Sequence, residues 1–271
     1  MPADFISIPH LHITSFVHNL RHRRLFDDVQ SYVMFIGYPR SAHTLVGFLL
    51  DAHPSIAVAS QASALKYIKY GFTRNQLFYV MLKNSQRVAE EGRGQRPYSY
   101  VVPNQWQGRF ERLQVIGDST GLSRARKNPT LIHALKKTLG NVELKAIHCI
   151  RNPYDNISTM AVKHNQMLQS AAKAYFSMCE TVEKIKGEIG NGAVYVLRHE
   201  SLVADPGATL ENLCGFLGVA GDGNYYRDCA SLIYKSPHKS RLEVSWSPEL
   251  IADVKSKLSR FGFLADYSYE V

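Results

Sequence analysis

Apolar residues along the chain form short runs of strand length, and segments with helical spacing separate these runs. The four longest runs cover residues 32–37, 113–117, 144–150 and 193–197, and a shorter fifth run covers residues 56–59. Strands that alternate with helices favour a parallel sheet with helices on both faces. We therefore predict an α/β fold with a central parallel β-sheet, and we expect ligands at the carboxyl ends of its strands.

Helical spacing and helix-terminal residues delimit the segments between the strands. We expect helices over residues 65–91, 169–189, 206–216 and 248–261, where Gly190 ends the second helix and Pro206 begins the third. Residues 92–112 are rich in glycine, proline and aromatic residues, and we expect an irregular insertion there that acts as a lid. No linker or repeat interrupts the chain, so we predict a single domain over residues 1–271, with residues 1–30 as an N-terminal extension.

The transition from the first strand to the first helix, YVMFIGYPRSAHT over residues 32–44, is typical of a phosphate-binding loop. Backbone N–H groups at a helix N-terminus and the helix dipole favour an anion at such a position. Arg40 adds a full positive charge, and the hydroxyls of Ser41 and Thr44 add donors. We predict that a phosphorylated cofactor binds to Arg40, Ser41, Ala42, His43 and Thr44.

A nucleotide-binding P-loop, GxxxxGK[ST], differs by little from residues 37–44. Ala42 and His43 stand in place of its second glycine and of the lysine that reaches the β- and γ-phosphates, and the loss of that lysine would weaken an ATP-hydrolysing site. Asp118 follows a strand, where the metal-holding acid of such a fold belongs. A P-loop kinase or NTPase therefore stays open as an alternative function.

A second strand-to-helix transition carries another group of anion-binding residues. Arg151 follows the run at residues 144–150, and Pro153 suits the first turn of the helix that comes next. Arg151 is expected at the strand end, and Ser158 or Thr159 would face it from about two turns into the helix. Two separate anion sites predict a cofactor with phosphates at two separated positions, whereas ATP needs one cluster.

Together these motifs resemble the PAPS-dependent sulfotransferase family, and residues 49–54 and 246–261 resemble its bacterial and protein-tyrosine branches. The family's first loop, PRSGTT or PKSGTT, cradles the 5′-phosphosulfate of 3′-phosphoadenosine-5′-phosphosulfate (PAPS) and is similar to PRSAHT at residues 39–44. Its second motif, R-[ND]-P-x(5)-S, binds the 3′-phosphate and begins at Arg151. The family serine falls on Thr159, with Ser158 one residue early.

The resemblance implies the activity and further site residues. It implies transfer of a sulfuryl group from PAPS to a hydroxyl or amine of a small-molecule acceptor, with release of PAP and without a metal. Arg40 would stabilise the leaving phosphate. A third motif at residues 196–218 places His199 where the family has a tyrosine near the adenine. The basic segment at residues 235–241 resembles a family loop that closes over the 3′-phosphate through Lys239 and Arg241; a solvated surface loop is the alternative.

The catalytic base is where the chain departs from the family pattern. The family glutamate falls on Gln61, which cannot take a proton, and a family lysine falls near Ser119. His43 is the first candidate base because its ordinary pKa of ~6.5 suits proton transfer, and its other role is donation to phosphate. Asp118 or a histidine such as His148 is the second candidate. The third explanation is a non-catalytic homologue that binds PAPS or PAP.

Composition and charge narrow the partners. The net charge of +9 fits an anionic ligand, yet the basic residues are spread along the chain, so nucleic acid is not expected. No apolar run is long enough for a transmembrane helix, and the N-terminus lacks the apolar core of a signal peptide. The four cysteines lack metal-site spacing. We therefore expect a cytoplasmic protein without a membrane partner, and nothing in the sequence indicates its oligomeric state.

Overall fold

The five apolar runs form one parallel sheet in the computed structural model, which describes residues 7–95, 98–120 and 130–270. Its strands are β1 (Ser31–Gly37), β2 (Ile56–Ala59), β5 (Val115–Asp118), β6 (Glu143–Ile150) and β7 (Val194–Arg198), in the order β2-β5-β1-β6-β7. Every neighbouring pair is parallel. All five strands therefore end at the same edge of the sheet, as the sequence predicts.

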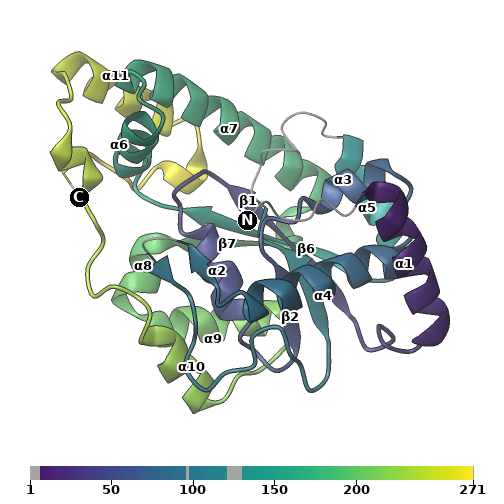
Figure 1. Ribbon diagram of the computed structural model, residues 1–271. Coiled ribbons are helices and arrows are strands. Elements are labelled where there is room, and N and C mark those ends of the chain that lie inside the picture. Colours follow the sequence, from purple (N-terminus) through teal and green to yellow (C-terminus); the bar gives the residue numbers. More distant parts are fainter. Residues whose placement is uncertain (1–6, 96–97, 121–129, 271) are drawn as a thin grey trace.

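Two apolar layers lie on the two faces of this sheet, because successive side chains of a strand point to opposite sides. On β1, Tyr32, Met34 and Ile36 pack into one layer, and Val33 and Phe35 pack into the other. Helices cover both layers (Figure 1), which confirms the predicted fold class.

The helices divide between the two layers and their margins. The first layer is covered by α4 (Arg74–Glu90), α5 (Thr130–Leu139), α7 (Leu168–Ile189) and α11 (Pro248–Leu258). The second is covered by α2 (His43–Leu50), α9 (Pro206–Leu217) and α10 (Gly223–Ala230). Further helices are α1 (Ile8–Arg21), α3 (Ala64–Lys69), α6 (Pro153–Lys163) and α8 (His199–Ala204).

The single helix predicted over residues 65–91 is wrong, because the segment folds as α3 and α4. Gly71 adopts φ +74° between them, a backbone conformation that favours glycine. Thr73 then begins α4 through a capping box with Gln76. Helix α1, which the sequence did not predict, packs against α4 within the N-terminal extension.

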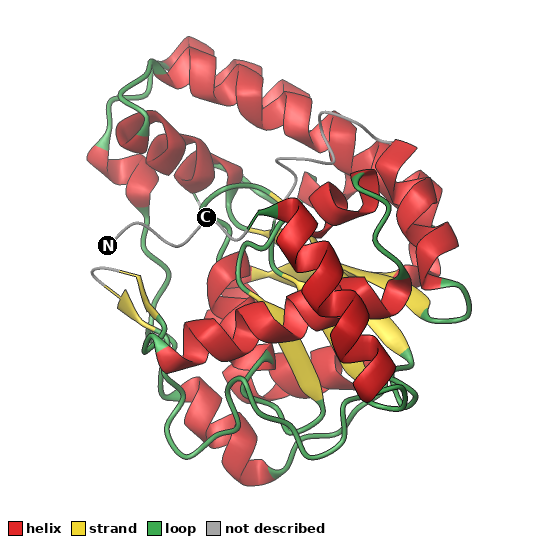
Figure 2. Cartoon of the chain, turned by 45° about the vertical axis from the view of Figure 1, so that its right-hand side comes forward, coloured by secondary structure: helices red, strands yellow, loops and turns green. Residues whose placement is uncertain are grey.

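The insertion at residues 92–112 holds a short antiparallel hairpin of β3 (Gly94–Gln95) and β4 (Tyr98–Ser99), which Figure 2 shows apart from the main sheet. Arg93 forms a buried ion pair with Asp51, the residue after α2. Farther on, the Trp106 amide donates to the Ala52 carbonyl (3.1 Å). These contacts lie at the C-terminal end of α2, whereas the phosphate loop precedes its N-terminal end. The described part of the insertion is therefore anchored at the far end of α2 from that loop, and its role as a lid stays a prediction.

Two glycines allow the close packing around α2. At the end of β1, a Cβ atom on Gly37 would lie 2.6 Å from the Cys149 carbonyl oxygen of β6. A Cβ atom on Gly47 of α2 would lie 2.7 Å from the Cβ of Ser119. Side chains at these two positions would push α2 and the preceding loop away from the strand ends, so the glycines fix where that loop lies.

His148 lies fully buried within β6 and belongs to the core. Its ring packs against Tyr38 and Phe263, with ring centroids 5.7 and 4.8 Å away. Neither ring nitrogen has a hydrogen-bond partner within the described residues. Burial, and secondarily the charge of Lys186, lowers the pKa of His148 well below its ordinary value. The ring is neutral, and it is no candidate for accepting a proton from an acceptor substrate.

The buried neutral His148 predicts a specific acid sensitivity. Its folded-state pKa is lowered, so only the unfolded chain gains a proton just below the ordinary pKa of ~6.5. As the pH is lowered through this range, the free energy of unfolding should therefore decrease, by up to about 1.4 kcal/mol per pH unit from this residue. Urea denaturation at about pH 7.5 and about pH 5.5 measures this decrease. The free energy of unfolding should decrease less between the two pH values in His148→Leu than in the wild type. His133→Gln, an exposed control on α5, should keep the wild-type loss; equal losses in wild type and H148L would contradict the prediction.

Candidate active site

The loop between β1 and α2 has two residues with left-handed backbone. Arg40 has φ +71° and Ala42 has φ +68°, and Ala42 precedes α2 without a capping side chain. For a residue other than glycine this conformation costs roughly 1–2 kcal/mol, and such strain is typical of ligand-binding loops. The Arg40 side chain is exposed. The first N–H groups of α2 and the Arg40 charge together can bind an anion.

Ser41 and His43 have different roles within this loop. The buried Ser41 hydroxyl donates to the Tyr38 carbonyl oxygen (2.8 Å), so it braces the loop. His43 is partly buried at the start of α2, beside the partly buried Thr44, and its Nδ1 has no hydrogen-bond partner within the described chain. Burial lowers the pKa of His43, as does the charge of Arg40, while the backbone of Tyr38 opposes the shift. A neutral His43 can accept a proton.

The second predicted anion site lies at the end of β6. Arg151 donates to the His238 carbonyl oxygen and to the Ser240 hydroxyl (3.1 Å), and the Thr159 hydroxyl lies 3.0 Å from the Ser240 Oγ. Arg151 is buried, and its Nε has no partner within the described residues. Burial lowers the pKa of Arg151, and Asp155 and Glu200 oppose that shift. The cluster of Arg151, Thr159 and Ser240 therefore combines a desolvated cation with two hydroxyls.

The structure distinguishes Ser158 from Thr159. Ser158 is fully buried, donates to the Tyr154 carbonyl oxygen (2.7 Å) and accepts from the Trp246 indole N–H (3.0 Å). Thr159 is the residue that reaches the Arg151 cluster through Ser240. Of the two hydroxyls predicted for the anion site, only that of Thr159 lies beside Arg151 and Ser240. Ser158 is the preceding residue of the helix and therefore points in another direction, toward Trp246.

Arg241 does not extend toward a ligand. It is buried, forms an ion pair with Asp155 (2.6 Å) and donates from Nε to the Tyr269 carbonyl oxygen (2.7 Å). The expectation that Arg241 closes over a phosphate is therefore corrected: its charge fastens residues 238–241 to α6. Lys239 is exposed on the same segment, and it is the cation there that remains accessible.

A side chain that the sequence analysis missed connects the two loops. Asn156 of α6 is fully buried, and its Nδ2 donates to the carbonyl oxygen of Pro39 (2.7 Å) in the first loop. The Asn156 Oδ1 has no partner within the described part of the chain. The only local signal was a polar residue on the inner face of a helix. The bond holds the first loop at a set distance from the helix that carries Thr159.

The end of β7 adds His199, the first residue of α8, to the second site. Burial lowers the pKa of His199, and the charge of Arg151 contributes to the same shift. The carboxylate of the neighbouring Glu200 accepts hydrogen bonds from the backbone N–H of Asn152 (2.8 Å) and from the Tyr267 hydroxyl (2.7 Å). Glu200, which the sequence analysis also missed, thereby ties α8 and the C-terminal segment to the loop after β6.

Asp118 at the end of β5 positions a neighbouring loop. Its two carboxylate oxygens accept from the amides of Ala62, Ala64 and Thr120, at 3.1, 2.8 and 3.0 Å, and from the Thr120 hydroxyl at 2.8 Å. Burial raises the pKa of Asp118, and these hydrogen bonds oppose the shift. The expectation that Asp118 acts as the catalytic base is corrected, because its carboxylate already accepts four hydrogen bonds. Gln61 is exposed on the loop that Asp118 holds.

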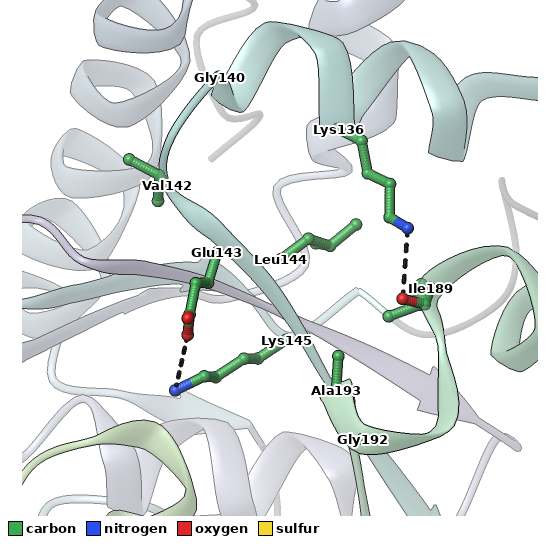
Figure 3. A pocket seen from close by; sticks show the side chains of 9 residues that line it. All are labelled: Lys136, Gly140, Val142, Glu143, Leu144, Lys145, Ile189, Gly192 and Ala193. Atoms are coloured by element: carbon green, nitrogen blue, oxygen red, sulfur yellow. Dashed lines mark hydrogen bonds and ion pairs between the residues drawn. The ribbon is translucent and has the colours of Figure 1, made fainter.

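A pocket of about 430 Å³ lies at the other end of the sheet, where β6 begins (Figure 3). Lys136 in its wall donates to the Ile189 carbonyl oxygen (3.2 Å), and Lys145 pairs with Glu143 (3.3 Å). Both lysines of the pocket already have partners, and the strand ends that carry the predicted motifs lie at the opposite edge. The pocket is therefore separate from the candidate site.

Comparison with known proteins identifies the family and the fold. A model of the sulfotransferase family matches residues 33–222, well over half of the chain. The structure is similar to the sulfotransferase domain of the Synechococcus PCC 7002 olefin synthase, with 17% identity, 84% of this chain and 89% of that chain covered, and a TM-score of 0.51. It is also similar to the sulfotransferase STF9 of Mycobacterium avium, with 11% identity, coverages of 94% and 83%, and a TM-score of 0.53. No curated protein sequence matches the chain.

Arg241 and Lys239 lie on one segment, but Arg241 is in a buried ion pair with Asp155 and Lys239 is exposed. Substitution of these two residues should therefore affect stability differently. Arg241→Met leaves the Asp155 charge buried without its ion-pair partner and with only the backbone N–H of residue 241 as a donor, so the free energy of unfolding should fall by about 3–5 kcal/mol. Lys239→Met removes an exposed cation and should change it by less than about 0.5 kcal/mol. Urea denaturation of both variants makes the comparison; similar stabilities would show that Arg241 is not the structural residue of the segment.

Proposed function

The chain belongs to the sulfotransferase family, and on this premise we propose that it transfers a sulfuryl group from PAPS to a hydroxyl or amine of a small-molecule acceptor. The observation that supports the proposal is the pair of candidate anion sites at the ends of β1 and β6, joined by the 2.7 Å hydrogen bond from Asn156 to Pro39. PAPS has a phosphosulfate at its 5′ position and a phosphate at its 3′ position, so it requires two such sites.

Unpartnered polar atoms support the fit of this donor. His43 Nδ1, Arg151 Nε and His199 Nδ1 are buried and have no hydrogen-bond partner within the described residues. A buried polar group without a partner costs about 1–3 kcal/mol, which a polar ligand can recover. His43 lies at the first anion site, and Arg151 and His199 lie at the second. A ligand that is anionic at both ends fits this distribution.

The proposal assigns binding roles to residues of both sites. Arg40, Thr44 and the N–H groups at Ala42 and His43 would hold the phosphosulfate. Arg151 and Thr159 would hold the 3′-phosphate, with the exposed Lys239 adding charge at the rim. His199 would lie beside the adenine. Charge-assisted hydrogen bonds of this kind are the strong ones in proteins, and they account for recognition without a metal.

The chemical step needs cations at the leaving group and a base at the acceptor. Transfer breaks the bond from sulfur to the phosphate oxygen and forms a bond from sulfur to the acceptor oxygen or nitrogen. Arg40 and the loop N–H groups would stabilise the charge that grows on the leaving phosphate. His43 would take the acceptor proton, since the lowered pKa keeps its ring neutral at neutral pH.

A second candidate function is binding of PAPS or PAP without turnover. Gln61 favours it, because the resemblance places the family glutamate at this position and an amide cannot accept the proton. A kinase has less support, since four donors occupy the Asp118 carboxylate that would otherwise hold a metal.

Ligand preference tests the donor. Calorimetric titration should show tight binding of PAP and weak binding of ATP with Mg²⁺. Arg40→Ala should weaken PAP binding by about 10- to 100-fold, the worth of a charged hydrogen bond. Arg227→Ala, an exposed arginine of α10, serves as the matched control and should bind PAP as the wild type does. A preference for ATP would contradict the donor, and unchanged affinity in R40A would contradict the first anion site.

Turnover tests the base. His43→Gln keeps a polar side chain but cannot take the proton, so PAP release from PAPS with a panel of phenols and amines should slow by about 10²- to 10⁴-fold. PAP affinity should stay within a few-fold of the wild type, and the control His133→Gln should keep full activity. Full activity in H43Q would reject His43 as the base. A wild type that binds PAP tightly and releases none with any acceptor would favour the binding-only function.

A further inference from the structure

Helix α1 carries an apolar stripe on its outer face. Ile13, Phe16, Val17 and Leu20 have 64, 55, 39 and 51% of their surfaces exposed. Their spacing of three, four and seven residues places them on one side of the helix. Figure 1 shows α1 at the margin of the molecule, outside α4. A neighbouring surface therefore has direct access to the stripe.

The face of α1 toward the protein is the more polar one. His12 contacts Gln76 of α4 (3.3 Å), and the rings of His18 and Tyr79 lie 4.4 Å apart. Ser15, also on this face, is fully buried. The usual arrangement, with the apolar stripe of a helix against the core, is thus partly reversed. Ile8 and Leu11 of α1 pack against the core, whereas the four apolar side chains of the stripe, Phe16 among them, lie in solvent.

A basic cluster adjoins the apolar stripe. It consists of Arg21, Arg23 and Arg24, all exposed, and residues 7–24 contain no aspartate or glutamate. Lys83 of α4 adds a further charge, which contributes with burial and His22 to the lowered pKa of His18. Acidic residues return at Asp27 and Asp28, and Arg112 pairs with Asp28 (2.9 Å).

We propose that this α1 face, meaning the apolar stripe with Arg21, Arg23 and Arg24, docks on an anionic lipid surface, contrary to the expectation from the sequence that the protein has no membrane partner. An exposed apolar stripe bordered by arginines is the arrangement with which a helix lies in the interface of a bilayer. Acidic headgroups would attract the arginines, because residues 7–24 contain no acidic side chain to pair with them. A second α1 helix would bring six arginines together without an acid from either segment. None of the described helices is long and apolar enough to cross a membrane, so the contact is peripheral.

Flotation of the full chain with vesicles tests the proposal. The wild type should float with phosphatidylcholine vesicles that contain about 30% phosphatidylserine and stay behind with phosphatidylcholine alone. Added NaCl should weaken binding, because attraction to the charged headgroups is screened. Arg23→Gln/Arg24→Gln should weaken it by about fivefold for each arginine removed.

A matched pair of variants separates the stripe from general surface hydrophobicity. Phe16→Gln/Leu20→Gln should reduce vesicle binding by about tenfold or more. Val162→Gln/Met167→Gln removes two side chains that are 67 and 71% exposed elsewhere and should leave it unchanged. Absence of vesicle binding, equal binding to both vesicles, or wild-type binding by F16Q/L20Q would overturn the proposal. A dimer that F16Q/L20Q dissociates, in a chain that ignores vesicles, would assign the face to a second copy instead.

Discussion

The parallel pairing of β1 with β6 is the constraint on which the candidate site depends. The two strands run side by side from Ser31 and Glu143 to Gly37 and Cys149, so the loops that follow them leave the sheet at the same level. More than a hundred residues separate these loops in the sequence. This register brings Asn156 within hydrogen-bond distance of Pro39 and sets the spacing of the two candidate anion sites.

Buried charges and carboxylates around the site mostly hold backbone segments in place. Asp155 and Arg241 fasten the 238–241 segment to α6, Asp118 holds the loop after β2, and Glu200 ties the C-terminal segment to the loop after β6. Burying charge is costly even when it is paired, so such contacts determine arrangement more than they add stability. With these groups engaged, Arg40, His43, Arg151 and His199 retain polar atoms that can meet a ligand.

The candidate site combines the exposed charge of Arg40 and the buried charge of Arg151 with few candidates for a base. His43 stands within the phosphate loop, and the lowered pKa that follows from its burial lets it act as a neutral acceptor of protons. Gln61 is exposed and carries no charge. The proposed docking of the α1 face on a lipid surface is independent of this chemistry.

The sequence by itself determined the strands and their parallel arrangement, and it located the two motifs that we predict to bind anions, because burial along a strand and the chemistry of a turn are local properties. It did not determine which hydroxyl of α6 faces Arg151, since that depends on Trp246 and Ser240 from a distant segment. The same reason accounts for Arg241, Asp118 and the insertion at residues 92–112, whose partners lie far away in the chain. A side chain becomes a ligand-binding or a structural group according to what packs against it, and only the tertiary structure decides that.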